Sequence, residues 1–175
     1  LRMLAAADAG LPVLLIAPTG AGKTLGGFLP GLARAAAGDV AGRLDTIYIS
    51  PLKALAADIA RNLERPIAEM GLGLQVGVRT GDTDQRTRER QRRSPPELLL
   101  TTPESLALML SYADAPRIFG RLVTVIVDEV HAIAGTKRGD LLALGLARLK
   151  SLSPGLRVVG LSATVADEEA VRRWV

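Results

Sequence analysis

The stretch Ala17-Pro18-Thr19-Gly20-Ala21-Gly22-Lys23-Thr24 decides the fold, through its own residues and through what stands on either side of it. The apolar run at residues 13–16 precedes it and predicts a strand, and a helical pattern over residues 22–37 follows it. A glycine-rich turn that ends in Lys-Thr and joins a strand to a helix is typical of a P-loop. We therefore expect the chain to bind the phosphates of a nucleoside triphosphate, with Mg²⁺, at this loop.

Each residue type in the loop suits this chemistry. Gly20 and Gly22 let the backbone N–H groups turn inward around phosphates, and the following helix points its positive dipole end at them. Lys23 can reach the β- and γ-phosphates, and the Thr24 hydroxyl can bind Mg²⁺. Ala17 stands where the general pattern has glycine, but this position only ends the strand, so we expect no loss of binding. The predicted nucleotide-binding residues are Thr19, Gly20, Ala21, Gly22, Lys23 and Thr24.

The rest of the chain alternates short apolar runs with helical patterns. The runs are continuously apolar, which is typical of strands buried on both faces of a parallel sheet. The alternation predicts an α/β fold with a mainly parallel sheet and helices on both faces. Pro30 and Pro66 are expected to break or kink two of the helices. Strands are predicted at residues 13–16, 46–49, 74–78, 98–100, 123–127 and 157–161, and helices at 22–37, 53–70, from Pro103, at 141–149 and from Asp167.

A second motif, Asp128-Glu129-Val130-His131, follows the most hydrophobic predicted strand. Asp128 can hold the Mg²⁺ of the P-loop, as a Walker-B aspartate does. Glu129 can take a proton from the attacking water. Two carboxylates at a strand end are otherwise a helix cap or a surface pair, but the P-loop upstream favours catalysis. Lys23, Asp128 and Glu129 are the predicted catalytic residues, and Thr24 and Asp128 the predicted metal ligands.

A third motif, Ser162-Ala163-Thr164, follows the last predicted strand. Taken alone, it could simply cap the helix that comes after it. Because ligands on parallel sheets bind at the carboxyl ends of the strands, and every motif stands after a strand, we expect all of them to gather at one edge.

Residues 82–96 form the one irregular stretch, and two interpretations of it stay open. Five arginines lie there together with Asp84 and Glu89, a mixed charge that is typical of a solvated helix or loop. The alternative is a basic rim that faces nucleic acid. The basic residues are Arg86, Arg88, Arg90, Arg92 and Arg93.

Composition bounds the class of protein. The 175 residues suit one globular domain, and the hydrophobic share of 48% is enough for a core. The sequence has no cysteine, hence no disulfide framework or thiolate metal site. No apolar run approaches the ~20 residues needed to cross a bilayer, so we expect a cytoplasmic protein without a membrane partner. Since the chain begins at Leu1 and not at Met, we interpret residues 1–175 as a single domain cut from a longer protein.

Together these motifs resemble the first motor domain of a superfamily 2 helicase of the DExH kind, which is a RecA-like P-loop NTPase domain. Residues 17–24 look like motif I, 128–131 like motif II and 162–164 like motif III. Between them, Ser50-Pro51-Leu52-Lys53-Ala54-Leu55 is similar to motif Ia, and Thr101-Thr102-Pro103-Glu104-Ser105-Leu106 to motif Ib. The five motifs occur in the order of the family and cover the whole chain.

A narrower resemblance rests on residues 78–83 and 131–139. These segments are similar to the large helicase-related group, which includes bacterial ligase-associated DNA-repair helicases. The resemblance implies ATP and Mg²⁺ as cofactors, 3′ to 5′ translocation on single-stranded DNA, and a role in DNA repair.

The resemblance also implies which residues touch the strand. Main-chain N–H groups and hydroxyls at motifs Ia and Ib hold backbone phosphates in such proteins, and these contacts position a strand without reading its sequence. His131, Ser162 and Thr164 would couple hydrolysis to strand movement. The implied nucleic-acid contacts are Pro51, Leu52, Lys53, Thr80, Gly81, Asp82, Thr102, Pro103 and Glu104.

Two family features do not occur in this sequence. No glutamine precedes Gln75, so the adenine-recognition motif that normally stands before motif I lies upstream of Leu1 or is missing. The second RecA-like domain, a partner expected in the full-length chain, would supply an arginine finger worth ~10³–10⁵ in rate. We therefore expect this chain alone to bind nucleotide weakly and to hydrolyse it barely.

The sequence leaves three alternatives to a DNA motor open. The first is an RNA-directed helicase of the same superfamily, which the motifs do not distinguish because they contact backbone phosphates. The second is a nucleotide-gated clamp that does not translocate, although a complete set of Lys23, Asp128 and Glu129 argues against a pure binder. The third is a P-loop kinase or small GTPase, for which the sequence carries no signal of a lid or an acceptor pocket.

Overall fold

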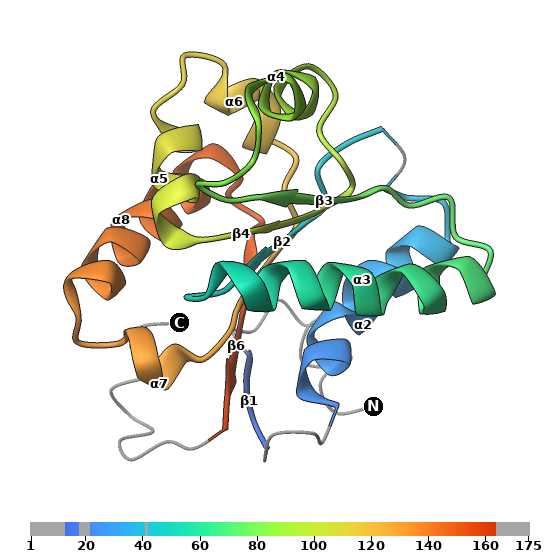
Figure 1. Cartoon of the computed structure of the whole chain (residues 1–175), viewed down its shortest axis with the longest axis horizontal. Coiled ribbons are helices and arrows are strands. Elements are labelled where there is room, and N and C mark those ends of the chain that lie inside the picture. The colour runs from blue at the N-terminus through green and yellow to red at the C-terminus, as the bar shows by residue number, and fades with distance from the viewer. Residues whose placement is uncertain (1–12, 18–21, 41, 164–175) are drawn as a thin grey trace.

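The computed structural model describes residues 13–17, 22–40 and 42–163. They form an α/β fold in which six strands, all parallel, make one sheet in the order β1-β6-β5-β2-β4-β3 (Figure 1). The strands are β1 (Val13–Ile16), β2 (Thr46–Ile49), β3 (Val76–Arg79), β4 (Leu98–Thr101), β5 (Thr124–Val127) and β6 (Arg157–Ser162). The helices are α2 (Lys23–Ala36), α3 (Lys53–Glu69), α4 (Gln85–Arg93), α5 (Pro103–Leu110), α6 (Ala115–Phe119), α7 (Val130–Ile133) and α8 (Lys137–Leu152).

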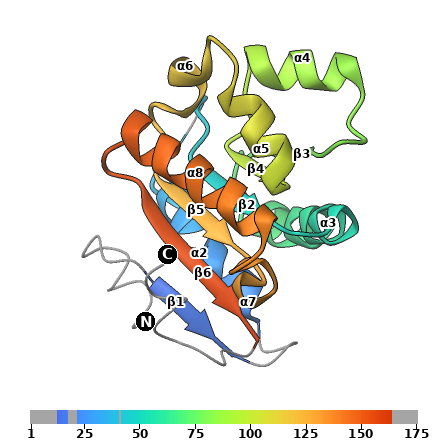
Figure 2. The same ribbon diagram turned by 90° about the vertical axis from the view of Figure 1, so that its left-hand side faces the viewer.

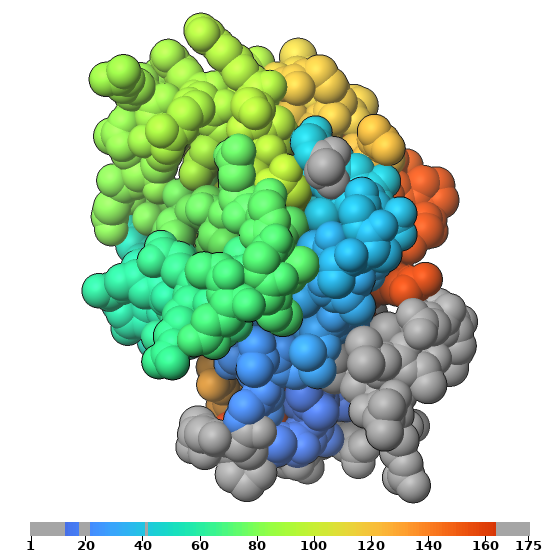
Figure 3. All heavy atoms as spheres, turned by 90° about the vertical axis from the view of Figure 1, so that its right-hand side faces the viewer, coloured from blue at the N-terminus to red at the C-terminus, as the bar shows by residue number. Residues whose placement is uncertain are grey.

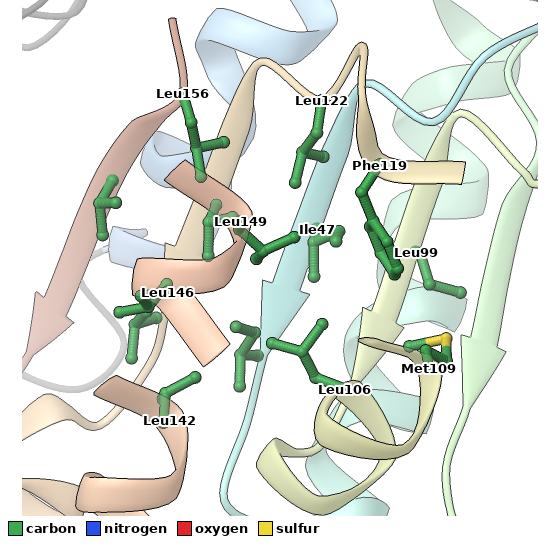
Figure 4. Packing of buried hydrophobic residues seen from close by; sticks show 14 of the residues in the cluster. Ile47, Leu99, Leu106, Met109, Phe119, Leu122, Leu142, Leu146, Leu149 and Leu156 are labelled. Atoms are coloured by element: carbon green, nitrogen blue, oxygen red, sulfur yellow. The ribbon is translucent and has the colours of Figure 1, made fainter. Parts of the chain in front are cut away.

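Side chains alternate between the two faces of the sheet, and each face has its own helical layer. Ile47 and Ile49 of β2 point to the face that α5, α6, α7 and α8 cover, where leucines of α8 meet Phe119 and Leu106 (Figures 2 and 4). Tyr48 points to the other face, which α2 and α3 cover. The predicted fold class, a parallel sheet with helices on both faces, is confirmed.

Neither proline ends its helix, so of the predicted break or kink the break is wrong. Pro30 lies inside α2 and Pro66 inside α3. A proline inside a helix costs roughly 3 kcal/mol, but burying a side chain such as Phe28 or Leu32 returns about 1.5–3 kcal/mol each. Both of these side chains pack on the sheet on either side of Pro30. Pro66 stands in the last turn of α3, and its carbonyl still accepts the N–H of Met70 at 3.0 Å.

Other boundaries differ from the prediction by a few residues. Helix α8 begins at Lys137 because the Thr136 side chain accepts the Gly139 N–H at 3.1 Å and caps it. The irregular stretch contains helix α4, and the short helices α6 and α7 carry no clear sequence signal. The helix predicted from Asp167 lies outside the described residues. Among the described helices, none has the length and apolar character to span a bilayer.

The carboxyl ends of the strands bring distant motifs together, as predicted. The Ala17 N–H donates to the Ser162 carbonyl at 3.2 Å, which joins the end of β1 to the end of β6. The Asp128 N–H donates to the Ile49 carbonyl at 2.9 Å, and the Ser50 N–H donates to the Thr101 carbonyl at 3.0 Å. Motifs I and III, II and Ia, and Ia and Ib are therefore neighbours along one edge of the sheet.

Candidate functional site

Lys23 opens α2 directly after the glycine turn. Gly22 precedes it with φ 73° and ψ 16°, a left-handed conformation that glycine adopts without strain. The Lys23 side chain is only 8% exposed, and its Nζ donates to the Ala17 carbonyl at 2.5 Å. The ammonium group is therefore folded back over the start of the loop. Thr24 lies partly buried in the first turn of α2, whereas Thr19, Gly20 and Ala21 lie outside the described residues.

Asp128 ends β5 as a buried carboxylate, 4% exposed, with both oxygens held. Its Oδ1 accepts the Glu129 N–H at 2.9 Å, and its Oδ2 accepts the hydroxyl of Tyr48. Tyr48 is fully buried and stacks on Phe28 with 5.4 Å between ring centroids. Burial, reinforced by the Asp128 carboxylate, raises the pKa of Tyr48 well above its usual range, so the hydroxyl keeps its proton and stays a donor.

Sequence reasoning missed Tyr48 as a site residue. It lies in an apolar run that predicts only a strand, and its contact with Asp128 exists because β2 pairs with β5 across a large sequence separation. A pattern along the chain does not carry that information.

Glu129 adopts a strained backbone conformation, with φ 50° and ψ 45°. Among the described residues, it is the only one other than glycine with positive φ, and such a conformation costs on the order of 1–3 kcal/mol. It allows the chain to leave β5 and begin α7 at once, with the Ala132 N–H donating to the Glu129 carbonyl at 2.8 Å. The Glu129 side chain is 25% exposed and so remains open to solvent.

His131 links the second motif to the third. Its Nδ1 lies 2.9 Å from the Ser162 Oγ at the end of β6 and 3.4 Å from the Glu129 Oε2. The structure thus brings together the acidic motif and one of the two predicted hydroxyls of the third motif. Thr164, the other hydroxyl, lies outside the described residues.

The oxygen donors at this edge suit Mg²⁺. A carboxylate from Asp128 and a hydroxyl from Thr24 are the hard ligands that Mg²⁺ prefers, and proteins commonly bind it through one or two carboxylates plus substrate phosphates. The described part of the chain holds no group of three or more His, Cys, Asp or Glu side chains that could bind a metal unaided. The residues therefore fit an ion that arrives with a phosphate ligand.

The residues implied to touch nucleic acid lie farther along the same edge. Leu52 is the N-cap of α3 and is 61% exposed, and its N–H donates to the Ser50 Oγ at 3.2 Å. Lys53, the next residue, forms an ion pair with Asp82, with 2.8 Å between Nζ and Oδ1. Motif Ia is thus tied to the loop after β3.

The loop after β3 is held by α4. Arg88 Nη2 donates to the Gly81 carbonyl at 2.7 Å and to the Thr80 carbonyl at 3.4 Å. The Asp82 N–H donates to the Thr80 Oγ1 at 3.3 Å. An open hollow of about 230 Å³ separates this loop from the start of α5. It is lined by Arg79, Thr80, Gly81, Arg88, Glu104, Ser105 and Leu108.

Arg138 joins motif Ib to motif Ia, and sequence reasoning assigned it no role. Its Nε lies 2.5 Å from Glu104 Oε1, and its Nη2 donates to Glu104 Oε2 at 3.1 Å and to the Pro51 carbonyl at 3.0 Å. This hydrogen bonding lowers the pKa of the Glu104 carboxyl below its usual range. Thr102 caps α5 and accepts the Ser105 N–H at 3.4 Å, with Pro103 at the first turn.

Comparison with known families gives a match over nearly the whole chain. A family model described as DEAD/DEAH box helicase matches residues 2–172. The chain is 47% identical over 180 residues to the Lhr helicase/probable uracil glycosylase of Mycolicibacterium smegmatis, with 95% of this chain and 12% of that protein covered. It is 43% identical over 183 residues to the ATP-dependent helicase Lhr-Core protein 2 of Thermococcus barophilus, with 95% and 21% covered.

A solved structure agrees with these matches. The structure of the Mycobacterium smegmatis helicase Lhr bound to ssDNA and AMP-PNP superposes with a TM-score of 0.89 at 45% identity, covering 97% of this chain and 23% of that one. The chain thus spans about an eighth to a quarter of the length of the proteins it matches.

Proposed function

The chain belongs to the DEAD/DEAH box helicase family, and from that premise we propose that it is the ATP-binding motor domain of an ATP-dependent helicase or translocase that moves on single-stranded DNA. The observation that carries this proposal is the single sheet edge where Lys23, Asp128 and Glu129 lie beside the joined motifs Ia and Ib. The resemblance inferred from the motifs is confirmed by the family match. Its similarity to a helicase that binds ssDNA and AMP-PNP supports the choice of DNA and ATP.

The proposed nucleotide site combines the P-loop with the acidic motif. Residues 19–24 cradle the phosphates, and the Lys23 ammonium turns from the Ala17 carbonyl to the β- and γ-phosphates. Thr24 and Asp128 would hold Mg²⁺, and a bound ion would supply positive charge against the phosphates during hydrolysis. Glu129 accepts a proton from the attacking water at its carboxylate. The bonds to Asp128 from Tyr48 and from the Glu129 N–H keep its carboxylate in one orientation.

The proposed coupling runs through His131. Its bond to Ser162 connects the catalytic loop to the end of β6, and Thr164 completes the third motif by resemblance. The Glu129 carboxylate also lies 3.4 Å from the Nδ1 of His131. A movement of Glu129 on hydrolysis would therefore reach Ser162 at the end of β6 through the His131 side chain.

The proposed strand site uses backbone donors more than basic side chains. Backbone N–H groups in the first turns of α3 and α5 suit phosphate oxygens. The two carboxylates there are neutralised, because Asp82 is paired with Lys53 and Glu104 with Arg138. The two ion pairs reduce the repulsion that the carboxylates would otherwise exert on an approaching phosphate.

The proposal extends to the protein that contains residues 1–175. As one motor domain, the chain would work with a second RecA-like domain that completes the nucleotide site, and the whole would act in the cytoplasm in DNA repair. The high identity to Lhr helicases supports this extension.

Strand displacement by the full-length protein tests the choice of nucleic acid. With matched DNA and RNA duplexes that carry the same single-stranded tail, we expect ATP-dependent displacement of the DNA duplex. Efficient displacement of RNA without displacement of DNA would overturn the DNA assignment. ATP-dependent retention of a strand without displacement of either duplex would favour the clamp.

Replacing Arg138 by glutamine is expected to weaken DNA binding with little loss of stability. The Arg138–Glu104 pair is roughly half exposed, and such pairs contribute about 0–1 kcal/mol to stability. Without the charged hydrogen bonds of Arg138, motif Ia is no longer bonded to motif Ib, and the proposed strand contacts lose their fixed positions. We therefore expect the DNA concentration for half-maximal ATP turnover to rise about tenfold. ATP turnover measured over a titration of single-stranded DNA gives this value.

Arg65→Gln is the matched control, because Arg65 forms an exposed ion pair with Glu69 on the far part of α3. It should leave the DNA titration within about twofold of the original protein, the scatter expected for an exposed pair. An equal effect of both substitutions, or none from Arg138→Gln, would contradict the role assigned to Arg138.

A further inference from the structure

Helix α4 carries five arginines in nine residues, and the structure divides them into three kinds. The helix is well anchored at its start, where the Asp84 side chain accepts the Thr87 N–H at 2.9 Å. That hydrogen bond lowers the pKa of Asp84. Gln91 is buried on the inner face and its Nε2 donates to the Val78 carbonyl at 3.1 Å. The orientation of every arginine on α4 is therefore set by a fixed helix.

Two of the arginines form hydrogen bonds or ion pairs with other parts of the fold. Arg88 points inward to the carbonyls of Thr80 and Gly81. Arg92 points sideways to Asp114, with 2.9 and 3.0 Å from its Nε to the two carboxylate oxygens. Its guanidinium also lies over the ring of Tyr112, 4.9 Å from the centroid.

The other three arginines form an outward stripe. Arg86, Arg90 and Arg93 are exposed and have no ion pair or hydrogen-bonded side-chain partner within the described part of the chain. Their spacing of four and three residues puts them on one face of the helix, where Arg90 borders the hollow that Gln91 also lines and Arg93 borders the one between Arg92 and Asp114. At 1.5 Å per residue, the stripe is about 10 Å long.

The fold gains little from this stripe, because only Arg90 and Arg93 stand in the last turn of α4, where a cation stabilises the helix dipole by about 0.3–1 kcal/mol at an exposed site. Like charges four residues apart destabilise a helix by about 0.2–0.5 kcal/mol, and no described acidic side chain pairs with any of the three. Glu89, the one acidic residue inside α4, is bonded to Gln85 at 2.9 Å instead. Three unpaired guanidinium groups in a row are suited to successive phosphates.

The stripe lies on the helix that holds the loop of the proposed strand site. Strand β3 is the edge strand of the sheet, at the opposite end from β1 and the P-loop. Helix α4 follows β3 and forms the upper corner of the molecule (Figures 1 and 2), and in the space-filling view it stands out from the body of α2 and α3 (Figure 3). Its inner arginine, Arg88, holds the loop with the proposed strand contacts Thr80 and Gly81.

We infer that Arg86, Arg90 and Arg93 bind the phosphate backbone of a DNA duplex that flanks the single strand held at motifs Ia and Ib. This inference rests on the proposed function and adds a second nucleic-acid surface to it. A duplex presents one charge per ~1.7 Å of its axis, about twice the density of one strand. A rigid row of charges about 10 Å long gains more from that fixed, dense array than from a flexible single strand.

Binding of two DNAs by the full-length protein tests the inference. One DNA is a short single strand, and the other is the same strand joined to a blunt duplex. For Arg86→Gln/Arg90→Gln/Arg93→Gln, we expect the affinity for the tailed duplex to fall 10- to 100-fold, and the slope of log K against log salt to become shallower by about 2–3. Affinity for the single strand should change less than about twofold, and Arg86→Lys/Arg90→Lys/Arg93→Lys should keep duplex binding.

A control variant separates this site from net charge. Arg61→Gln/Arg65→Gln/Arg148→Gln removes three exposed arginines from α3 and α8, and it should leave the tailed duplex bound as before. Equal losses in both triple variants, equal losses on both DNAs, or no loss from the α4 variant would each overturn the inference. Failure of the unsubstituted protein to bind the single strand would instead overturn the proposed function.

Discussion

Glu129→Gln in the full-length protein is expected to lower ATP turnover by roughly 10²–10⁴, the usual contribution of a general base. The amide cannot accept the proton of the attacking water, but it has the shape of the carboxylate. Because Glu and Gln have the same backbone preferences, the left-handed conformation at φ 50° should persist. Steady-state ATP turnover with saturating single-stranded DNA measures the effect.

The same variant should still bind ATP and DNA. The proposed nucleotide contacts come from Lys23 and the rest of the P-loop, and the proposed strand contacts lie farther along the sheet edge. Affinity for both ligands should therefore stay within about threefold, or less than 1 kcal/mol. Glu69→Gln, a change of the same kind at an exposed pair with Arg65, serves as the control. ATP turnover that survives Glu129→Gln would mean that another group takes the proton.

This outcome also decides between the motor and the nucleotide-gated clamp. A motor stalls when hydrolysis stops, so displacement of a duplex should be lost together with ATP turnover. A clamp needs only bound nucleotide, and its hold on a strand would not depend on the Glu129 carboxylate. ATP-dependent retention of a strand by Glu129→Gln, without displacement of a duplex by the unsubstituted protein, would therefore favour the clamp.

The parts of this molecule that sequence predicted are those governed by local rules. The apolar strand runs and the order of motifs each depend on neighbouring residues, so the parallel sheet and the shared edge were predictable. The nearness of Asp128 to Ile49 and of Ala17 to Ser162 follows from one topological rule about parallel strands.

The parts that sequence missed depend on contacts between distant segments. Tyr48 reaches Asp128 across 80 residues, and Arg138 reaches Pro51 across 87. Pro30 was expected to break or kink a helix, yet α2 continues through it, because burial of Phe28 and Leu32 beside it outweighs the local preference. The division of the α4 arginines into inward, sideways and outward groups likewise needs the packing of α4 on β3 and α6.

Lys23→Ala is expected to lower ATP turnover by about 10²–10³, the loss typical of removing one donor that stabilises developing charge. ATP affinity should fall together with it, about tenfold or more, because an ammonium contact to a phosphate is a charge-assisted bond. The free energy of unfolding should not decrease. Lys23 is 8% exposed and its described partner is one carbonyl, that of Ala17, and a buried charge without a counter-ion is costly to keep.

Lys53→Ala is the matched comparison, because Lys23 and Lys53 are each the first residue of a helix that follows a parallel strand. Lys53 is 53% exposed and paired with Asp82 at the proposed strand site. Its loss leaves the Asp82 carboxylate unpaired near phosphates, so DNA affinity should fall a few-fold, as for one lost surface charge pair, while ATP affinity stays unchanged. Direct measurement of ATP binding and of single-stranded DNA binding by both variants therefore distinguishes the proposed nucleotide site at Lys23 from the proposed strand site at Lys53. Equal loss of ATP affinity in both variants would show that the phosphates are not held at Lys23.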